Sequence, residues 1–260
     1  MTMSPRISVI TPAYNADQYV KRVTRSVLSQ RDVDLEWIIV DDCSTDNTLV
    51  EIRAEVGDDP RVRLIRASRN GGVSEARNLA LAHAVGEYVC FLDVDDSWAP
   101  DKLAVQYQFM QESNADVTAM DYLRVDESQR PLGLVRPPPV ITFRMMLNSN
   151  RIGNLTAMVR RSLLTDVAFR RIGHEDYVFW LDALRKAKMV LRVPTQEPLC
   201  FYTVRSSSIS ADKRAAAKWQ WTIYRSVLKM SFIDSCWYFL NYALLGVMKR
   251  VSPAPGRGRS

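Results

Sequence analysis

The sequence predicts an α/β fold built on a mostly parallel, doubly wound sheet. Short apolar runs alternate with longer helix-forming segments through about the first 110 residues. Glycine, proline or capping residues separate these runs, as they do between the strands and helices of such folds. Hydrophobic residues make up 47% of the chain and charged residues 25%, which is ordinary for a globular protein and excludes a largely disordered one.

The first half of the chain is predicted to hold four strands and four helices in alternation. The strands are expected at 7–11, 35–40, 61–66 and 87–92. The helices are expected at 17–29, after a cap at Ser44 or Asp46, at 73–86 between a Ser74 cap and a Gly86 stop, and from Pro100 to about 111. Segment 61–66 alternates apolar and polar residues, so we expect it near an edge of the sheet.

The second half is less regular, and we expect it to extend the sheet. Strands are predicted at 115–125, 155–160, 189–193 and 197–204, with a Pro-rich break at 136–140. A short helix or turn is predicted at 142–150 and a longer helix at 174–187, followed by a helical tail. Residues 253–260 look like a disordered basic end.

Charge is divided unevenly along the chain. Residues 1–139 hold 15 Lys and Arg against 22 Asp and Glu, a net charge of −7, whereas residues 140–260 hold 20 against 7, a net of +13. The basic half is suited to a phosphorylated substrate or an anionic membrane surface, and no nucleic-acid-binding motif accompanies it. Four widely spaced cysteines without a CxxC motif, and no apolar signal segment, predict a cytoplasmic protein with reduced thiols.

Three carboxylates, Asp93, Asp95 and Asp96, crowd the end of the fourth apolar run in "FLDVDD". Like charges repel by about 4 kcal/mol at ~4 Å in a surface-like dielectric, so the cluster suggests a divalent cation, Mg²⁺ or Mn²⁺, that also binds a substrate phosphate. Capping of the helix near Pro100 would explain one aspartate but not three. A phosphatase with Asp93 as nucleophile is an alternative, although its nucleophile strand usually comes first in the fold.

Two further motifs follow neighbouring predicted strands. "ITPAYN" places Tyr14 where a base can stack, and "VDDCSTDNT" places Asp42 where a carboxylate can accept from a base N–H. The Gly-Gly turn of "RNGGVSEARN" leads into a predicted helix whose N–H groups, together with Arg77, can bind an anion. Together these features favour a nucleotide pocket at the carboxyl ends of the strands.

The chain resembles family 2 glycosyltransferases of the GT-A fold, particularly bacterial transferases of polysaccharide, O-antigen and exopolysaccharide synthesis. The resemblance is carried by "SVITPAYN", "WIIVDDCSTDNT", "NGGVSEARNLAL", "GEYVCFLDVDD" and "HEDYVFWL", in family order over residues 6–185. It implies inverting, metal-dependent transfer of a sugar, expected from a UDP-sugar, to a glycan or polyprenyl-diphosphate-linked acceptor. A non-catalytic nucleotide-sugar-binding relative is the remaining alternative.

The resemblance also implies roles for individual residues. The general base is expected at Asp176 in preference to Glu175, because inversion needs one base for the acceptor hydroxyl. The metal is expected at Asp95 and Asp96. The nucleotide is expected at Pro12, Ala13, Tyr14, Asn15, Asp42, Asn70, Gly72, Arg77, Asp93, Val94 and Asp95. A phosphate or the acceptor is expected at Arg205, Ser208, Ser210, Lys213, His174 and Trp180.

The tail carries one more feature, an almost wholly apolar stretch at 236–248 flanked by basic residues. Because ~20 residues are needed to span a bilayer, we expect this stretch to lie at the inner face of the membrane, although a core helix is the alternative. The predicted organisation is a nucleotide-sugar half at 1–112, an acceptor and catalytic-base half at 113–215, C-terminal helices at 216–252 and the tail at 253–260.

Overall fold

The structure, a computed structural model, describes residues 6–187, 189–205 and 213–251. Its centre is an eight-stranded sheet in the order β3-β2-β1-β4-β10-β6-β11-β9. These strands are β1 (Ile7–Ala13), β2 (Leu35–Asp41), β3 (Val62–Arg66), β4 (Tyr88–Phe91), β6 (Val117–Ala119), β9 (Val140–Thr142), β10 (Met158–Arg160) and β11 (Met189–Arg192). Only β10 and β9 run against the others, so the predicted mostly parallel sheet is confirmed.

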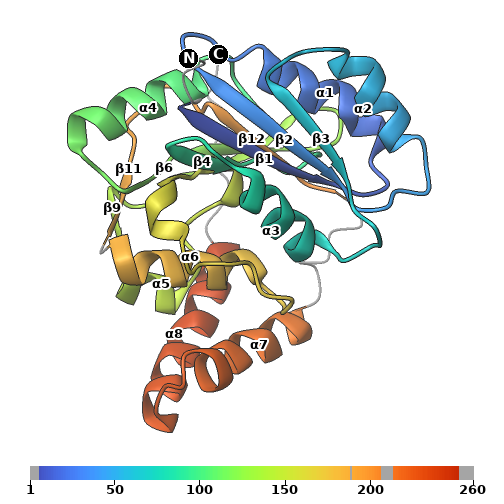
Figure 1. Cartoon of the computed structure of the whole chain (residues 1–260). Helices are drawn as coiled ribbons and strands as arrows, with labels where there is room; N and C mark the ends of the chain where they lie inside the picture. The colour runs from blue at the N-terminus through green and yellow to red at the C-terminus, as the bar shows by residue number, and fades with distance from the viewer. Residues whose placement is uncertain (1–5, 188, 206–212, 252–260) are drawn as a thin grey trace.

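Helices cover both faces of this sheet (Figure 1). One face carries α1 (Asp17–Leu28), α2 (Thr48–Val56) and α4 (Lys102–Ser113), and the other carries α3 (Val73–His83) and α6 (Glu175–Ala187). Apolar side chains fill both layers, with Trp37 in one and Phe91 in the other completely buried. Burial on both faces explains why β1, β2 and β4 are continuous apolar runs. The edge strand β3 alternates, as its position predicts.

The parallel pairing of β1 with β4 positions the site. Ile10 pairs with Phe91, so the two strands end at the same edge of the sheet. The residues after β1 and the aspartates after β4 therefore lie at the same edge of the sheet, the edge at which open α/β sheets bind ligands.

Several local predictions were wrong because tertiary packing overrides the local pattern. The predicted strand 115–125 is split at Met120–Asp121 into β6, in the large sheet, and β7 (Tyr122–Val125), in a second one. That four-stranded sheet has the order β5-β12-β7-β8 and adds β5 (Ser97–Trp98), β8 (Pro131–Val135) and β12 (Cys200–Thr203). β5, β8 and β9 were not predicted, since each is too short to show a period.

The predicted helix caps also need correction. Helix α3 follows Gly72, and the Ser74 hydroxyl donates to the Arg170 carbonyl at 3.2 Å instead of capping. The helix ends at His83, and Gly86 lies beyond it, where a Cβ would come within 2.6 Å of the Ser8 nitrogen. Helix α4 follows Asp101 with no side-chain cap, so capping explains none of the three aspartates.

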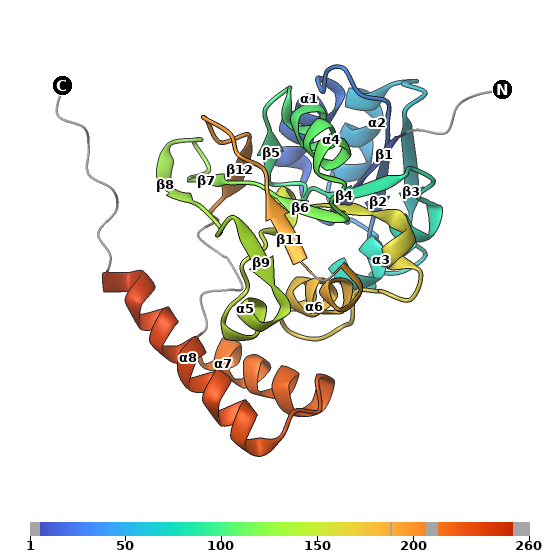
Figure 2. The ribbon, with the colours of Figure 1, turned by 90° about the vertical axis from the view of Figure 1, so that its left-hand side faces the viewer.

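The C-terminal helices pack beneath α5 (Phe143–Asn148) and α6 and extend away from the sheet (Figure 2). They are α7 (Lys213–Thr222), a π-helical turn at Ile223–Val227 and α8 (Phe232–Val251), and two 3₁₀ turns lie earlier, at Asn154–Thr156 and Arg161–Leu164. Within the described residues, none of the helices has both the length and the apolar character needed to cross a bilayer.

Candidate active site

A cavity of about 920 Å³ lies at the carboxyl edge of the sheet. It is bordered by the start of α3, the segment after β4, the loop that leads to Asn154, the start of α6, the end of β12 and one residue of α7. Eight residues predicted from the sequence line it: Arg77, Asp93, Asp95, Asp96, His174, Glu175, Asp176 and Arg205. The fold therefore brings the aspartate cluster and the predicted base, about eighty residues apart, onto one wall.

Arg77 joins the two acidic groups of this cavity. Its side chain is only 4% exposed, and its guanidinium donates to Asp93 Oδ1 at 2.6 Å and to Glu175 Oε1 at 3.3 Å. It also lies over the Phe169 ring, 5.0 Å from the centroid. Burial opposes its charge, yet the Asp93 and Glu175 carboxylates raise the pKa of Arg77. We expected Arg77 to contact a base or phosphate, but its visible contacts hold the site together.

The three aspartates have different environments. Asp93 faces Arg77, whereas the Asp95 carboxylate lies 3.4 Å from the Arg205 guanidinium. Asp96 is 2% exposed and accepts from the Thr203 N–H at 2.9 Å. Burial raises the pKa of Asp95 and, together with its two neighbours, raises the pKa of Asp96 well above that of an ordinary aspartate. The cluster therefore favours binding of a proton or a cation.

Glu175 and Asp176 open helix α6 beside this cluster. Burial raises the pKa of both carboxyls, and Arg77 opposes the shift in each. Glu175 accepts from the Arg77 guanidinium, whereas one oxygen of Asp176 accepts from Asn150 Nδ2 at 3.2 Å. The Asn150 amide is itself fixed, since its oxygen accepts from the Ile152 N–H at 3.0 Å. Asp176 is therefore oriented by a neutral side-chain donor, whereas Glu175 is held by a charged one.

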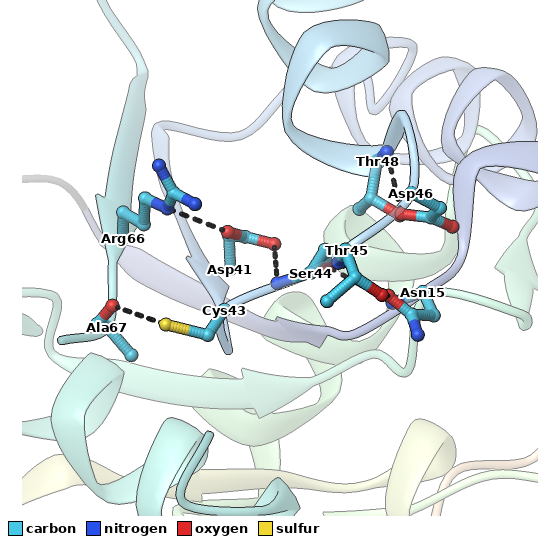
Figure 3. Close-up of polar contacts among 9 residues, drawn as sticks. All are labelled: Asn15, Asp41, Cys43, Ser44, Thr45, Asp46, Thr48, Arg66 and Ala67. Atoms are coloured by element: carbon cyan, nitrogen blue, oxygen red, sulfur yellow. Dashed lines mark hydrogen bonds and ion pairs between the residues drawn. The ribbon is translucent and has the colours of Figure 1, made fainter. Parts of the chain in front are cut away.

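Asn15, a predicted nucleotide residue just after β1, lies against the loop that follows β2 (Figure 3). The Asn15 oxygen accepts from the Thr45 N–H at 2.8 Å, and Asp46 accepts from the Thr48 N–H at 2.9 Å. Asp46 thus serves the start of α2 as predicted, although Asn47 occupies the cap position. These bonds fix the loop after β2 next to Asn15 and thus beside its neighbour Tyr14, a residue that is 48% exposed. An exposed aromatic at this edge of the sheet suits the base stacking that was predicted for Tyr14.

Asp42 has a role that the sequence did not reveal. It is 3% exposed, and its two oxygens accept from the Gly71 and Gly72 N–H groups at 2.9 and 2.7 Å. Gly72 has a φ of +82°, a conformation that favours glycine. Asp42 therefore holds the glycine turn, which carries the exposed Asn70 and leads into Val73 and Arg77 on the cavity wall. The predicted contact with the nucleobase would use the lone pairs of the Asp42 carboxylate that the glycine N–H groups leave unoccupied.

Other predicted residues are placed differently. Trp180 does not contact the acceptor cavity: it is completely buried and packs edge-to-face on Phe91 and Phe179. The side chains of Pro12, Ala13 and Val94 are also buried, so only their backbones are available to a ligand. His174 lines the cavity, with its ring edge-on to Trp219 at 5.3 Å. Ser208, Ser210 and the Lys213 side chain lie outside the described residues.

The cavity also contains residues that the sequence analysis missed. They are Tyr122, Arg136, Asn150, Arg151, Tyr202 and Trp219. Apart from Tyr202, which belongs to the segment that supplied Arg205, none belongs to a motif, and the polar residues around 148–154 were the remaining signal. Trp219 belongs to α7, where it packs on Gly173 so closely that a Cβ there would come within 2.0 Å of its ring. The C-terminal helices are thus part of the active-site wall.

Comparison with solved structures defines the class of protein. The fold matches Staphylococcus aureus TarS, solved in complex with UDP-GlcNAc, with a TM-score of 0.71, 22% identity and coverage of 93% of this chain and 72% of that one. It also matches the mannosyltransferase PcManGT of Pyrobaculum calidifontis, solved with GDP-Man and Mn²⁺, with a TM-score of 0.66, 19% identity and coverage of 98% and 78%. The fold is that of the GT-A glycosyltransferases, as predicted.

Comparison with known sequences gives the family. Residues 8–168 match glycosyl transferase family 2. The chain is 36% identical to Bacillus subtilis (strain 168) TuaG, named for teichuronic acid biosynthesis, over 95% of this chain and 98% of that protein. It is 31% identical, over 94% of each, to Escherichia coli WfgD, a UDP-Glc:alpha-D-GlcNAc-diphosphoundecaprenol beta-1,3-glucosyltransferase. The chain belongs to glycosyl transferase family 2, and it is a glycosyltransferase.

Proposed function

We propose that this protein transfers a sugar, with inversion, from a UDP-sugar to an acceptor linked to a lipid diphosphate, in cell-surface polysaccharide synthesis. The observation that carries the proposal is the single cavity wall that Arg77 builds by binding both Asp93 and Glu175. Such a wall would bring a site for the leaving diphosphate beside a site for the base. The names of WfgD and its E. coli relative WfaP, 30% identical, support the donor and acceptor classes.

The donor would lie along the ends of β1, β2 and β4. Its base would stack on Tyr14 near the Asp42 turn, and its diphosphate would lie towards Asp95 and Arg205. Arg205 reaches Asp95 at 3.4 Å, and half-buried arginines bind phosphates well. This arrangement spreads the negative charge of the leaving group over groups already in place.

The aspartates suit a divalent cation that binds together with the donor. Within the described residues, no three acidic, histidine or cysteine side chains come together as a complete metal site. Mg²⁺ and Mn²⁺ commonly take one or two carboxylates and complete their shell with substrate phosphates and water. Asp95 and Asp96 supply such oxygens. When bound, the cation would neutralise charge that develops on the departing diphosphate.

Asp176 would remove the proton from the attacking acceptor hydroxyl. An inverting transfer is a single displacement, so it needs one base on the side opposite the leaving group and no protein nucleophile. Asp176 lines the cavity that would receive the acceptor. The phosphatase hypothesis loses its main support, because β4 is a central strand of a family 2 transferase.

Replacing Asp95 tests the donor site. We expect UDP with Mn²⁺ to raise the melting temperature of the wild-type protein, and Asp95→Asn to remove this shift, because a metal ligand and a phosphate-side charge are lost. Asp101→Asn, an exposed aspartate after the same strand, is the matched control and should keep the shift. An unchanged shift in Asp95→Asn would show that the diphosphate binds elsewhere.

We further propose that α8 binds the inner surface of the membrane. Ile233, Trp237, Leu240 and Leu244 recur at helical spacing and are 80%, 68%, 62% and 56% exposed. They form one apolar stripe on a helix that extends from the body (Figure 2), with the exposed Lys229 just before it. An apolar face with a tryptophan and nearby basic residues is typical of helices that lie in the interface of anionic membranes.

Charges on this stripe should abolish membrane binding. We expect Trp237→Glu/Leu240→Glu to remove co-sedimentation with anionic phospholipid vesicles. Two apolar side chains that would insert into the membrane become carboxylates, which the anionic surface repels. Val50→Glu alters a 64% exposed valine on α2, on another face, and should bind like wild type. Equal vesicle binding by the double variant and wild type would contradict the proposal, whereas activity on a water-soluble acceptor should persist in both variants.

A further inference from the structure

Arg151 stands out among the arginines of the cavity wall. Arg77 is paired with Asp93 and Glu175, Arg205 with Asp95, and Arg136 with Asp121 at 2.6 Å. Within residues 6–187, 189–205 and 213–251, Arg151 differs from these three arginines in having no ion pair; its buried Nε, like that of Arg77, has no hydrogen-bond partner. A half-buried guanidinium without a counter-charge is costly, so its position suggests an anionic ligand.

The loop of Arg151 is fixed before any ligand arrives. The Arg151 N–H donates to Met146 Sδ at 3.3 Å, and the next residue, Ile152, donates to Asn150 Oδ1 at 3.0 Å. Both neighbours of Arg151 are therefore tied into local structure. A guanidinium on a fixed loop loses less conformational freedom on binding, which favours it as an anchor.

Arg151 belongs to the acceptor side of the cavity. It directly follows Asn150, whose amide donates to Asp176. Asp176 must contact the acceptor hydroxyl in the proposed reaction, whereas the donor diphosphate lies towards Asp95 and Arg205. An anion held by Arg151 is therefore a group carried by the acceptor.

The charges of the cavity explain why such an anchor is needed. Five carboxylates line the wall: Asp93, Asp95, Asp96, Glu175 and Asp176. A phosphate-bearing acceptor would be repelled from them without a local positive charge. A neutral glycan would need no such charge.

We propose that Arg151 forms a second anion subsite, which binds the phosphate of a sugar-diphosphate acceptor while its hydroxyl reaches Asp176. This inference rests on the proposed function and deepens it, because it assigns the acceptor's charged group to one side chain. It predicts a preference for a sugar linked through diphosphate over the same sugar linked without phosphate.

The test measures binding to protein loaded with UDP and Mn²⁺. The probes are octyl-diphosphate-linked N-acetylglucosamine and the octyl glycoside of the same sugar without phosphate. We expect Arg151→Gln to weaken binding of the diphosphate probe about 10- to 100-fold and to leave the neutral probe and UDP unaffected. Arg151→Lys should restore part of the affinity, because it keeps the charge but not the fork of donors.

Arg144→Gln is the matched control, because Arg144 is an exposed arginine of α5 that does not line the cavity. It should behave like wild type. The inference would be overturned if Arg151→Gln lost affinity equally for both probes, or if the wild-type protein did not bind the diphosphate probe. Weaker UDP binding in Arg151→Gln would also overturn it, and would assign Arg151 to the donor. Failure of the wild-type protein to bind UDP at all would instead overturn the proposed function.

Discussion

Asp176→Asn should lower the turnover number for sugar transfer by about 10²- to 10⁴-fold, the usual contribution of a general base. Asparagine fills the same space but cannot take the proton of the acceptor hydroxyl. The dissociation constant for UDP should stay within about twofold of wild type, because Asp176 is not part of the proposed donor site. Single-turnover kinetics and calorimetry with UDP and Mn²⁺ measure the two effects separately.

Glu175→Gln is the matched control for this experiment. The Glu175 carboxylate is ion-paired with Arg77 at 3.3 Å, whereas Asp176 accepts from the neutral amide of Asn150. We therefore expect a smaller loss in Glu175→Gln. A larger loss in Glu175→Gln, with near-normal turnover in Asp176→Asn, would identify Glu175 as the base.

The pH dependence of transfer provides a second readout of the same residue. A general base must be deprotonated, and burial raises the pKa of Asp176 above that of an ordinary aspartate. Transfer should therefore increase with pH through this raised pKa, at higher pH than for an exposed carboxyl. The residual activity of Asp176→Asn should lack that acidic limb.

The parts of this fold that sequence patterns predicted are those dominated by local burial. Buried parallel strands such as β1, β2 and β4 must be apolar along their whole length, so their runs were visible. The Gly71–Gly72 turn and the crowded aspartates could also be recognised in the sequence. A positive φ favours glycine, and adjacent carboxylates repel one another, so both patterns indicate a special local structure. These features are the basis for the predicted donor half of the site at the strand ends.

The parts that could not be predicted depend on contacts between distant segments. β10 runs antiparallel between β4 and β6, and nothing in its three residues reveals that position. Trp180 lies one helical turn after the predicted base Asp176, but its ring is completely buried against Phe91, a residue of β4 that lies far away in the sequence. Arg77 is the clearest example, because its partners Asp93 and Glu175 come from two separate elements.

Arg77→Gln should destabilise the protein by about 3 kcal/mol, near the lower end of the range for breaking a buried ion pair. The loss leaves Asp93 and Glu175 without their counter-charge, although both remain partly exposed, at 32% and 25%, which limits the cost. For a chain of this size, that corresponds to a fall in melting temperature of about 6–12 °C. Thermal unfolding followed by circular dichroism measures it.

Arg69→Gln is the matched control, because Arg69 pairs with Glu75 on the surface of the same helix start, at 70% and 42% exposure. Exposed pairs of this kind contribute little, so its melting temperature should remain near wild type. Arg77→Lys keeps the charge but cannot reach both carboxylates with one planar group, so it should be intermediate.

The same substitution should change the chemistry as well as the stability. Arg77 opposes the burial that raises the pKa of Glu175 and Asp176. Without it, the pKa of Asp176 rises further, so the acidic limb of transfer should move to higher pH in Arg77→Gln and less in Arg77→Lys. A lower melting temperature with an unmoved pH profile would mean that Arg77 only supports the fold. A moved profile in both variants, graded with the remaining charge, would establish that this arginine sets the charge state of the catalytic base.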